Sequence, residues 1–379
     1  MTVALLAPRL PPACDGVGDH AAWVARALAK TGERVVVFSE IHASIPSVDV
    51  EFVQSWNLAS IVTTLRRMRE RRSELLLIEY TPFNFGSRSI APHAIAAIAR
   101  LRGIRVGLFL HEGFYGQRSL HKTGGLKRAL LGLRDAFIVA ASAATFTSSE
   151  PRRRELQAAI PWSRSRLHVV PIGANVEPAA TEIWSAPSDR PYRLVTFGVV
   201  VPKRRLEVLV RVMGAAARRD IGLRLVVIGR VHDERYAQSC MTLARELGVA
   251  DAVRFTGSLD PSEVSRELMR GHLAITALME GAVASSGSLL ALLAHGLPLL
   301  AARTPHDEPV FDGALAYSSD DPEAMLDAAL GILRSPDGGA ELGRRARSRY
   351  ERQFRWDEIV RRARRLALEV DCRSAVSAG

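Results

Sequence analysis

Hydrophobic residues along the first half of the chain fall into short runs, and amphipathic segments separate them. The runs have the length of buried strands and lie at 3–7, 34–38, 75–79, 105–110, 145–148 and 167–170. Between them, 18–30 and 58–72 repeat apolar residues at helical spacing, and a further helix is expected to end at Gly103. Alternation of buried strands with such helices is typical of a parallel sheet covered on both faces. The pattern predicts an α/β, doubly wound fold.

The same alternation starts again after a proline-rich stretch at 178–190. Strands are expected at 192–197, 224–228 and 253–256, and helices at 206–219, 234–247, 322–335, 338–352 and 356–369. A chain of 379 residues is too long for one ordinary core. We therefore expect a first domain at 1–177, a linker at 178–190 and a second domain at 191–355.

Composition narrows the class of protein. Hydrophobic residues make up 47% and charged residues 24% of the chain, and no apolar run approaches the ~20 residues of a membrane span. No basic region precedes the first apolar run, so we interpret it as a strand and not a signal peptide, and expect a cytoplasmic protein. The three cysteines are far apart, which favours neither a disulfide framework nor a zinc site.

The formal charge of +11 is carried mostly by arginine and favours anionic partners. Nucleic acid is not expected, because the arginines are spread along the chain and no recognition motif contains interleaved aromatic residues. The basic, amphipathic stretch at 113–134 could contact an anionic membrane surface or form a solvated helix.

The stretch at 274–301 combines a short strand, a loop of small residues, a helix from Ser288 to the stop at Gly296, and a second strand. Free N–H groups at the start of this helix would suit a phosphate or a ribose. A plain strand–helix–strand crossover is the alternative.

Three further sites lie where a parallel strand ends. Gly16 and Gly18 occupy the first strand-to-helix turn, but no third glycine completes a dinucleotide fingerprint. Lys203, Arg204 and Arg205 precede a helix, where they could bind phosphate or simply form a basic helix start. His111 follows a strand and is either a ligand-binding or a structural histidine.

Asp320 and Asp321 precede a helix and are expected to cap it, so we predict no metal site there.

Together these segments resemble the family 4 glycosyltransferases. The resemblance covers nearly the whole chain and is carried by DGVGDH at 15–20, VVPIGANV at 169–176, FGVVVPKRRLEVL at 197–209, VRFTGSLDPSEV at 253–264, LLALLAHGLPLLAA at 289–302 and FRWDEI at 354–359. It implies the GT-B architecture, in which two Rossmann-like domains face each other across a cleft. It also implies that the last helix, at 356–379, packs back onto the first domain.

The resemblance implies a hexosyltransferase that moves a sugar from a nucleoside diphosphate sugar to an acceptor hydroxyl with retention, without metal or cofactor. His111 would contact the donor sugar and Glu280 its hydroxyls. The donor diphosphate would be bound by Gly16, Lys203, Arg204, Ser286, Gly287 and Ser288. The nucleoside would be bound by Gly229, Ser258 and Leu259. The acceptor side would comprise Gly18, Asp19, His20 and Glu112.

The sequence departs from the family where two glutamates usually hold the sugar and the ribose. Val283 and Ala291 stand at those places, while Glu280 and Ser288 keep the spacing three residues earlier. Val199 replaces the usual arginine after the loop glycine. A catalytically weak binding or regulatory protein, or a sugar nucleotide epimerase, therefore remains as an alternative.

The donor base, the sugar and the acceptor are not specified by these residues. We expect an acceptor that is lipid-linked or a small metabolite, in the synthesis of a bacterial glycan, glycolipid or glycosylated metabolite. In the lipid-linked case 113–134 would contact the inner membrane surface.

Overall fold

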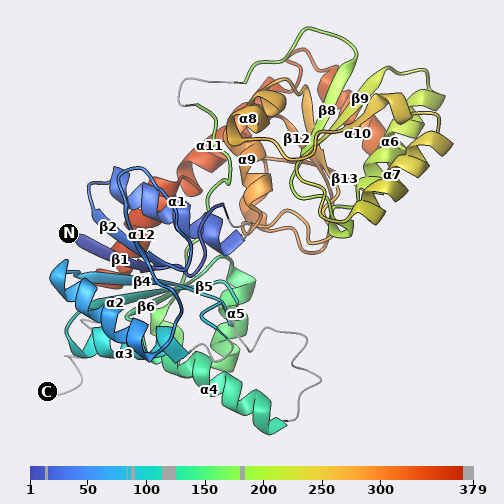
Figure 1. Ribbon diagram of the computed structural model, residues 1–379. Helices are drawn as coiled ribbons and strands as arrows, with labels where there is room; N and C mark the ends of the chain where they lie inside the picture. The colour runs from blue at the N-terminus through green and yellow to red at the C-terminus, as the bar shows by residue number, and fades with distance from the viewer. Residues whose placement is uncertain (13–15, 83, 87–89, 113–124, 180–183, 370–379) are drawn as a thin grey trace, which may run out of the picture. The chain divides into compact units, whose positions relative to one another are not determined.

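The computed structural model describes residues 1–12, 16–82, 84–86, 90–112, 125–179 and 184–369, which form two compact units (Figure 1). The first unit comprises Met1–Ile172 and Trp356–Gly379, and the second comprises Gly173–Arg355. The division at Ile172 corrects the expected boundary at residue 177.

The segment at 178–190 is not a free linker in its described part. Trp184 is buried, and its indole N–H donates a hydrogen bond of 2.8 Å to the carbonyl of Gly271. Nε2 of His272 lies 3.0 Å from the carbonyl oxygen of Asp189. These contacts attach the segment to the second unit, which proline content alone did not indicate.

The first unit is built on a seven-stranded parallel sheet in the order β3-β2-β1-β4-β5-β6-β7. The strands are β1 (Thr2–Leu6), β2 (Arg34–Ser39), β3 (Asp49–Phe52), β4 (Leu75–Tyr80), β5 (Arg105–Leu110), β6 (Ala144–Thr147) and β7 (Leu167–Val169). Strand order reverses between β1 and β4, so the doubly wound fold expected from the hydrophobic pattern is confirmed.

Helices cover both faces of this sheet. They are α1 (Gly16–Lys30), α2 (Leu58–Glu70), α3 (Ile90–Leu101), α4 (Gly125–Ala141), α5 (Glu150–Ala159) and α12 (Trp356–Leu368). Successive side chains of a strand point to opposite faces. Val3 and Leu5 pack with α1 and α12, whereas Ala4 and Leu6 pack in the core of α2 to α5.

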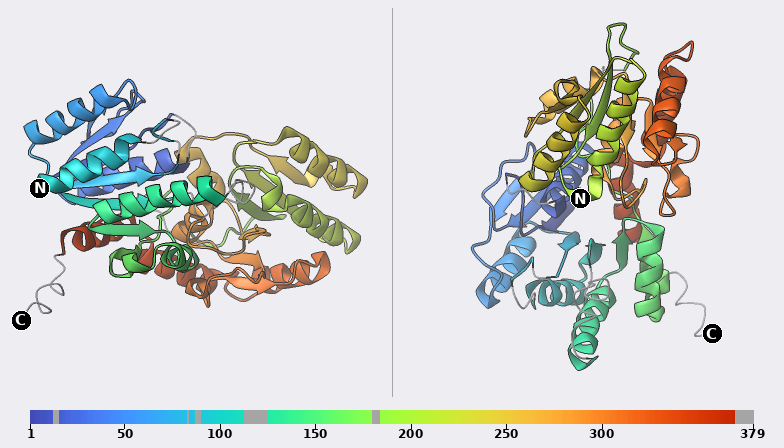
Figure 2. Two further views of the ribbon diagram at one scale, coloured as in Figure 1. Left: turned by 90° about the horizontal axis from the view of Figure 1, so that it is seen from below. Right: turned by 90° about the vertical axis from the view of Figure 1, so that its right-hand side faces the viewer.

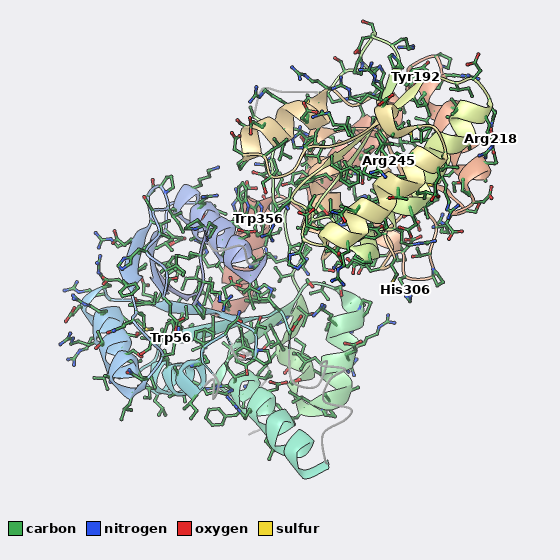
Figure 3. All side chains as sticks on the ribbon, turned by 45° about the vertical axis from the view of Figure 1, so that its right-hand side comes forward. Trp56, Tyr192, Arg218, Arg245, His306 and Trp356 are labelled. Atoms are coloured by element: carbon green, nitrogen blue, oxygen red, sulfur yellow. The ribbon has the colours of Figure 1, made fainter. Side chains whose placement is uncertain are left out.

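The last helix belongs to the first unit. It packs on α1 and β5, and the labelled Trp356 at its first residue stacks on Trp23 of α1 with ring centroids 5.9 Å apart (Figure 3). Its buried residues, among them Ile359 and Ala363, recur at helical spacing, which is why an amphipathic helix is recognisable in the sequence.

The second unit contains a six-stranded parallel sheet in the order β10-β9-β8-β11-β12-β13. Its strands are β8 (Tyr192–Phe197), β9 (Leu223–Ile228), β10 (Val253–Phe255), β11 (Leu273–Thr276), β12 (Leu299–Ala302) and β13 (Ala316–Ser318). Its helices are α6 (Leu206–Arg218), α7 (Glu234–Glu246), α8 (Pro261–Met269), α9 (Gly287–His295), α10 (Pro322–Leu333) and α11 (Ala340–Gln353). In Figure 2 the yellow-green α6 and the yellow α7 run side by side.

Four elements had no counterpart in the sequence prediction: β3, α5, α8 and β13. Strand β3 is partly exposed, and α5 buries only Leu156 in a very polar sequence, so neither has a strong hydrophobic pattern. Helix α8 did carry a signal, because Asp260 and Glu263 form a reciprocal capping box at its start.

The two aspartates before α10 have different roles. Asp321 caps the helix, as expected, and its side chain accepts from the N–H of Ala324 at 2.9 Å. Asp320 instead pairs with Arg205 at 2.7 Å, which corrects the expectation that both would cap.

Across the described ranges, no helix has the length and hydrophobicity needed to cross a membrane.

Candidate functional site

In the first unit, the carboxyl ends of β4 and β5 place two chemically active side chains next to a third from α1. Glu79 is the last residue but one of β4, His111 directly follows β5, and His20 lies in α1. Parallel strands that lie beside a reversal of strand order are where open α/β sheets bind ligands. The expected His111 and His20 therefore meet at this edge of the sheet.

Glu79 joins the two histidines. Its Oε2 lies 3.0 Å from Nδ1 of His20 and 2.5 Å from Nε2 of His111. The glutamate side chain is fully buried, and those of His20 and His111 are 6% and 19% exposed. The two imidazole rings meet edge to face with centroids 4.8 Å apart. An ionised carboxylate only accepts hydrogen bonds, so both facing nitrogens carry protons.

The environment shifts the pKa values of this cluster. Burial alone would raise the pKa of Glu79, but the charge of His20 and hydrogen bonds from both histidines lower it to about 2. Burial lowers the pKa of His111 below its ordinary 6.5, against the opposing effect of Glu79. Glu79 is therefore a buried carboxylate and His111 a neutral imidazole near pH 7.

Neighbouring groups fix the cluster in place. Arg152 of α5 donates a hydrogen bond to the backbone carbonyl of His111. The ring of His20 packs edge-on against Phe109 and Trp356, at centroid distances of 5.1 and 5.3 Å. Sequence reasoning missed Glu79, although an acidic residue within the apolar run LLLIEY was a usable signal.

The other residues expected on the acceptor side lie close to this cluster in the chain. Gly16 opens α1, and Asp19 and Glu112 are exposed. At Gly18 a Cβ atom would lie only 3.0 Å from the carbonyl oxygen of Arg9, so glycine allows the loop after β1 to pass close to the helix.

In the second unit, two glycines bring the loops after β8 and β9 into contact. Gly198 and Gly229 have φ angles of 136° and 133°, which side-chain-bearing residues rarely adopt. A Cβ atom on Gly229 would lie 2.3 Å from the carbonyl oxygen of Gly198. Gly229, which we expected to bind the nucleoside, is thus required by the backbone conformation of this turn.

Arg204 is the one of the three basic loop residues that lies against these glycines. Its Nη1 lies 3.4 Å from the carbonyl oxygen of Phe197, and its guanidinium occupies the space where Gly198 would carry a Cβ. Nε is buried without a hydrogen-bond partner in the described chain. Burial lowers the pKa of Arg204, and the negative charge of Glu280 offsets only part of this effect. A guanidinium nevertheless stays charged at neutral pH.

The two neighbours of Arg204 have other partners. Arg205, in the left-handed region at φ 51°, forms its ion pair with Asp320. Lys203 lies 3.5 Å from Glu280, and both side chains are about half exposed. The structure therefore places Glu280 beside Lys203, and of the three basic residues it is Arg204 that has a buried nitrogen without a partner in the described chain.

The start of α9 supplies N–H groups and hydroxyls. Ser286 caps the helix by accepting from the N–H of Leu289 at 3.4 Å, and its hydroxyl lies 3.4 Å from that of Ser288. Before it, the loop N–H groups of Ala282 and Ala284 are bound by the carboxylates of Asp307 and Glu308, at 2.8 and 3.1 Å. These two carboxylates, which sequence reasoning missed, fix the loop.

The remaining nucleoside candidates lie at the ends of β9 and β10. The N–H of Gly229 donates to the hydroxyl of Thr256 at 3.2 Å, and Gly229 also bridges to Gly257. Ser258 and Leu259 follow directly and are exposed and half-buried. The structure therefore joins the end of β10 to Gly229, and the binding of a nucleoside by Gly229, Ser258 and Leu259 stays a prediction.

The His20, Glu79 and His111 atoms also form the one group in the described ranges whose spacing could admit a metal, since they lie within 4.8 Å of one another. The contacts of 2.5 and 3.0 Å between the facing atoms are hydrogen bonds from the histidine N–H groups to Glu79, however. That the protein needs no metal stays a prediction.

Comparisons with known proteins identify a family match in the second unit and relatives of part of the chain. Residues 191–335 match the family described as glycosyl transferases group 1. A GDP-mannose-dependent α-(1-6)-phosphatidylinositol monomannoside mannosyltransferase of Mycobacterium tuberculosis is 26% identical over 235 residues, which cover 57% of this chain and 59% of the relative. A D-inositol 3-phosphate glycosyltransferase of Saccharomonospora viridis is 31% identical over 170 residues, which cover 42% of this chain and 38% of the relative. The matches thus span less than two thirds of these relatives.

Solved structures resemble the whole chain. A sucrose-phosphate synthase from Thermosynechococcus elongatus aligns over 100% of both chains with a TM-score of 0.65 and 15% identity. WaaG, a glycosyltransferase of lipopolysaccharide biosynthesis, aligns over 97% of this chain and 100% of its own, with a TM-score of 0.64 and 14% identity. At such identities the likeness shows the fold.

Proposed function

Residues 191–335 form a domain of the glycosyl transferases group 1 family within a chain of GT-B fold, and from this premise we propose that the protein transfers a sugar from a nucleoside diphosphate sugar to an acceptor hydroxyl. The reaction forms a bond between the acceptor oxygen and the anomeric carbon. It breaks the bond from that carbon to the diphosphate, and the acceptor proton is released. We further propose that the anomeric configuration is retained and that the sugar is a hexose.

The observation that carries this proposal is the part-buried Arg204 beside Gly198, whose Nε is buried. A guanidinium with an unpartnered Nε is unfavourable in a protein interior unless a ligand completes its hydrogen bonds. A diphosphate offers both the charge and the acceptors, and it gains negative charge as the sugar leaves. The start of α9 at Ser286 adds N–H groups and the positive end of a helix dipole.

In this proposal the neutral His111 contacts the donor sugar, and Glu280 binds its hydroxyls. Lys203, Gly16, Gly287 and Ser288 assist with the diphosphate. Gly229, Ser258 and Leu259 bind the nucleoside, whereas Gly18, Asp19, His20 and Glu112 serve the acceptor. No metal is needed, because arginine and N–H groups stabilise the leaving diphosphate.

The names of the relatives suggest acceptors to test. Both are named for acceptors that contain inositol, one lipid-linked and one a small phosphate. We propose that this protein likewise acts on a polyhydroxylated acceptor of one of these two kinds, in glycan or glycolipid synthesis in the cytoplasm.

A lipid-linked acceptor would need contact with the membrane. Most of 113–134, which we expect to make it, lies outside the described residues. In the described part of α4, Leu133 and Phe137 lie one turn apart and expose 65% and 52% of their surface. Exposed apolar residues on a helix of a basic protein are suited to an anionic lipid surface.

A donor screen followed by product analysis tests the proposal. A nucleoside diphosphate sugar at 100 times its dissociation constant should stabilise the protein by about 2.7 kcal/mol. Donors that pass are then incubated with inositol phosphates and phosphatidylinositol mannosides, and products are identified by mass spectrometry. Transfer supports the proposal. Epimerisation of the donor without transfer would identify an epimerase, and binding with neither reaction would identify a regulatory protein.

A further inference from the structure

Glu79 is the one acidic residue of β4 and has no exposed surface. Burying a carboxylate is costly unless hydrogen bonds or opposite charge compensate for the lost water. Its Oε2 receives both histidine N–H groups, while its Oε1 is buried without a partner within the described chain. Within the described chain, the compensation for burying this carboxylate therefore comes from His20 and His111.

The hydrogen bond to Glu79 determines which nitrogen of His111 carries the proton. Because a carboxylate oxygen cannot donate, the proton is on Nε2, and in a neutral ring Nδ1 then carries the lone pair. Nδ1 makes no hydrogen bond to any other described residue, and 19% of the side chain is exposed. A ligand hydroxyl can therefore reach an acceptor and not a donor.

We propose that Glu79 is a positioning residue that holds His111 in the Nε2–H tautomer, so that Nδ1 accepts a hydrogen bond from a substrate hydroxyl. His20 donates to the same oxygen and restrains the carboxylate from the other side. The role of His111 toward substrate rests on the proposed function, but its tautomer is a property of the free protein. Two measurements separate these claims.

The first measurement is ¹⁵N NMR of the full chain labelled at histidine, without substrate. The His111 signals are assigned by their loss in His111→Asn. Wild-type protein should show a protonated Nε2 and a lone-pair Nδ1. In Glu79→Gln the side-chain amide can donate to Nε2, so the population should move toward the Nδ1–H tautomer. A Nδ1–H tautomer in wild type, or no change in a folded Glu79→Gln protein, would overturn the proposal.

Glu79→Asp keeps a carboxylate and serves as the matched control, which should retain the wild-type tautomer if it reaches Nε2. Circular dichroism establishes whether each variant folds. If Glu79→Gln does not fold, the wild-type spectrum still decides, because the Nδ1–H form there contradicts the hydrogen-bond assignment.

The second measurement is kinetic and requires that transfer has been established. Glu79→Gln should lower turnover by about tenfold or more, since one substrate hydrogen bond is lost, and should leave nucleoside diphosphate affinity unchanged. Because Glu79 acts through His111, the double variant with His111→Ala should be no slower than His111→Ala alone. Full additivity would overturn the positioning role. Absence of any transfer would refute the proposed function and leave the NMR result standing.

Discussion

Replacing Arg204 by alanine should weaken binding of a nucleoside diphosphate and hardly affect binding of the corresponding nucleoside. Arg204 lies at the turn between β8 and α6, where its guanidinium packs on Gly198. The base and ribose are expected to bind elsewhere in the unit, at the Gly229 turn. The loss should therefore follow the phosphate groups and not the rest of the ligand.

The size of the effect follows from the hydrogen bonds that Arg204 has available. Within the described chain its Nη1 makes only a long contact of 3.4 Å to Phe197, and Nε makes none. A charge-assisted hydrogen bond to phosphate contributes about 1.5 to 3 kcal/mol, which corresponds to roughly tenfold to a hundredfold in the dissociation constant. The unliganded variant should fold normally, because it loses a part-buried cation that has few partners.

Isothermal titration calorimetry with matched diphosphates and nucleosides measures this difference. Arg205→Ala is the closest control, because Arg205 is paired with Asp320 and should leave both affinities within about threefold of wild type. Lys203→Ala provides a comparison, since Lys203 is exposed and paired with Glu280 and should therefore lose less diphosphate affinity than Arg204→Ala. Equal losses for nucleoside and diphosphate in Arg204→Ala, or a loss only in Lys203→Ala, would refute the assignment of the phosphate site.

Four further outcomes are expected. His111→Ala should lower turnover more than tenfold and leave diphosphate binding nearly intact, because a group at the sugar acts mainly on the transition state; unchanged steady-state turnover would remove His111 from the site. Gly229→Ala should lower the melting temperature markedly, since a Cβ there meets the Gly198 carbonyl at φ 133°; a wild-type thermal transition would contradict this. As pH falls below 6.5, the free energy of unfolding should decrease, because burial, with the nearby His20 and Arg152 and against the effect of Glu79, makes the folded state resist protonation of His111; urea titrations in which His111→Asn behaves like wild type would exclude that cause. The full chain should co-sediment with anionic liposomes at low salt through 113–134, and failure to do so would favour a soluble acceptor.

All sheet strands except β3 and β13 could be predicted, because most of them are continuous apolar runs bounded by glycine or polar residues. β8, for example, was expected at its observed bounds, Tyr192–Phe197. Helix α5 could not be predicted in this way, because it buries only Leu156 and therefore has no apolar face. The prediction of the fold class depended on the apolar strand runs, so it did not need the elements that were missed.

The backbone features of the candidate site were predictable from the sequence. Gly198 and Gly229 mark tight turns at strand ends, and Ser286 marks a helix start, all of which are legible in sequence. Ion pairs and hydrogen bonds between residues far apart in the chain could not be predicted from the sequence. Arg205 could not be distinguished from Arg204 until its partner Asp320, 115 residues away, was known. The role of Glu79 likewise became apparent only when the structure placed it beside His20 and His111.

The central claim is most directly tested by following a donor labelled with ¹³C at the anomeric carbon by NMR, in the presence of the candidate acceptors. We expect the labelled carbon to appear in a new glycoside of the same anomeric configuration, with release of an equal amount of nucleoside diphosphate. A glycoside of inverted configuration would contradict the retaining assignment. Labelled carbon that remains in an epimerised or unchanged nucleotide sugar, with every donor that binds, would contradict sugar transfer itself.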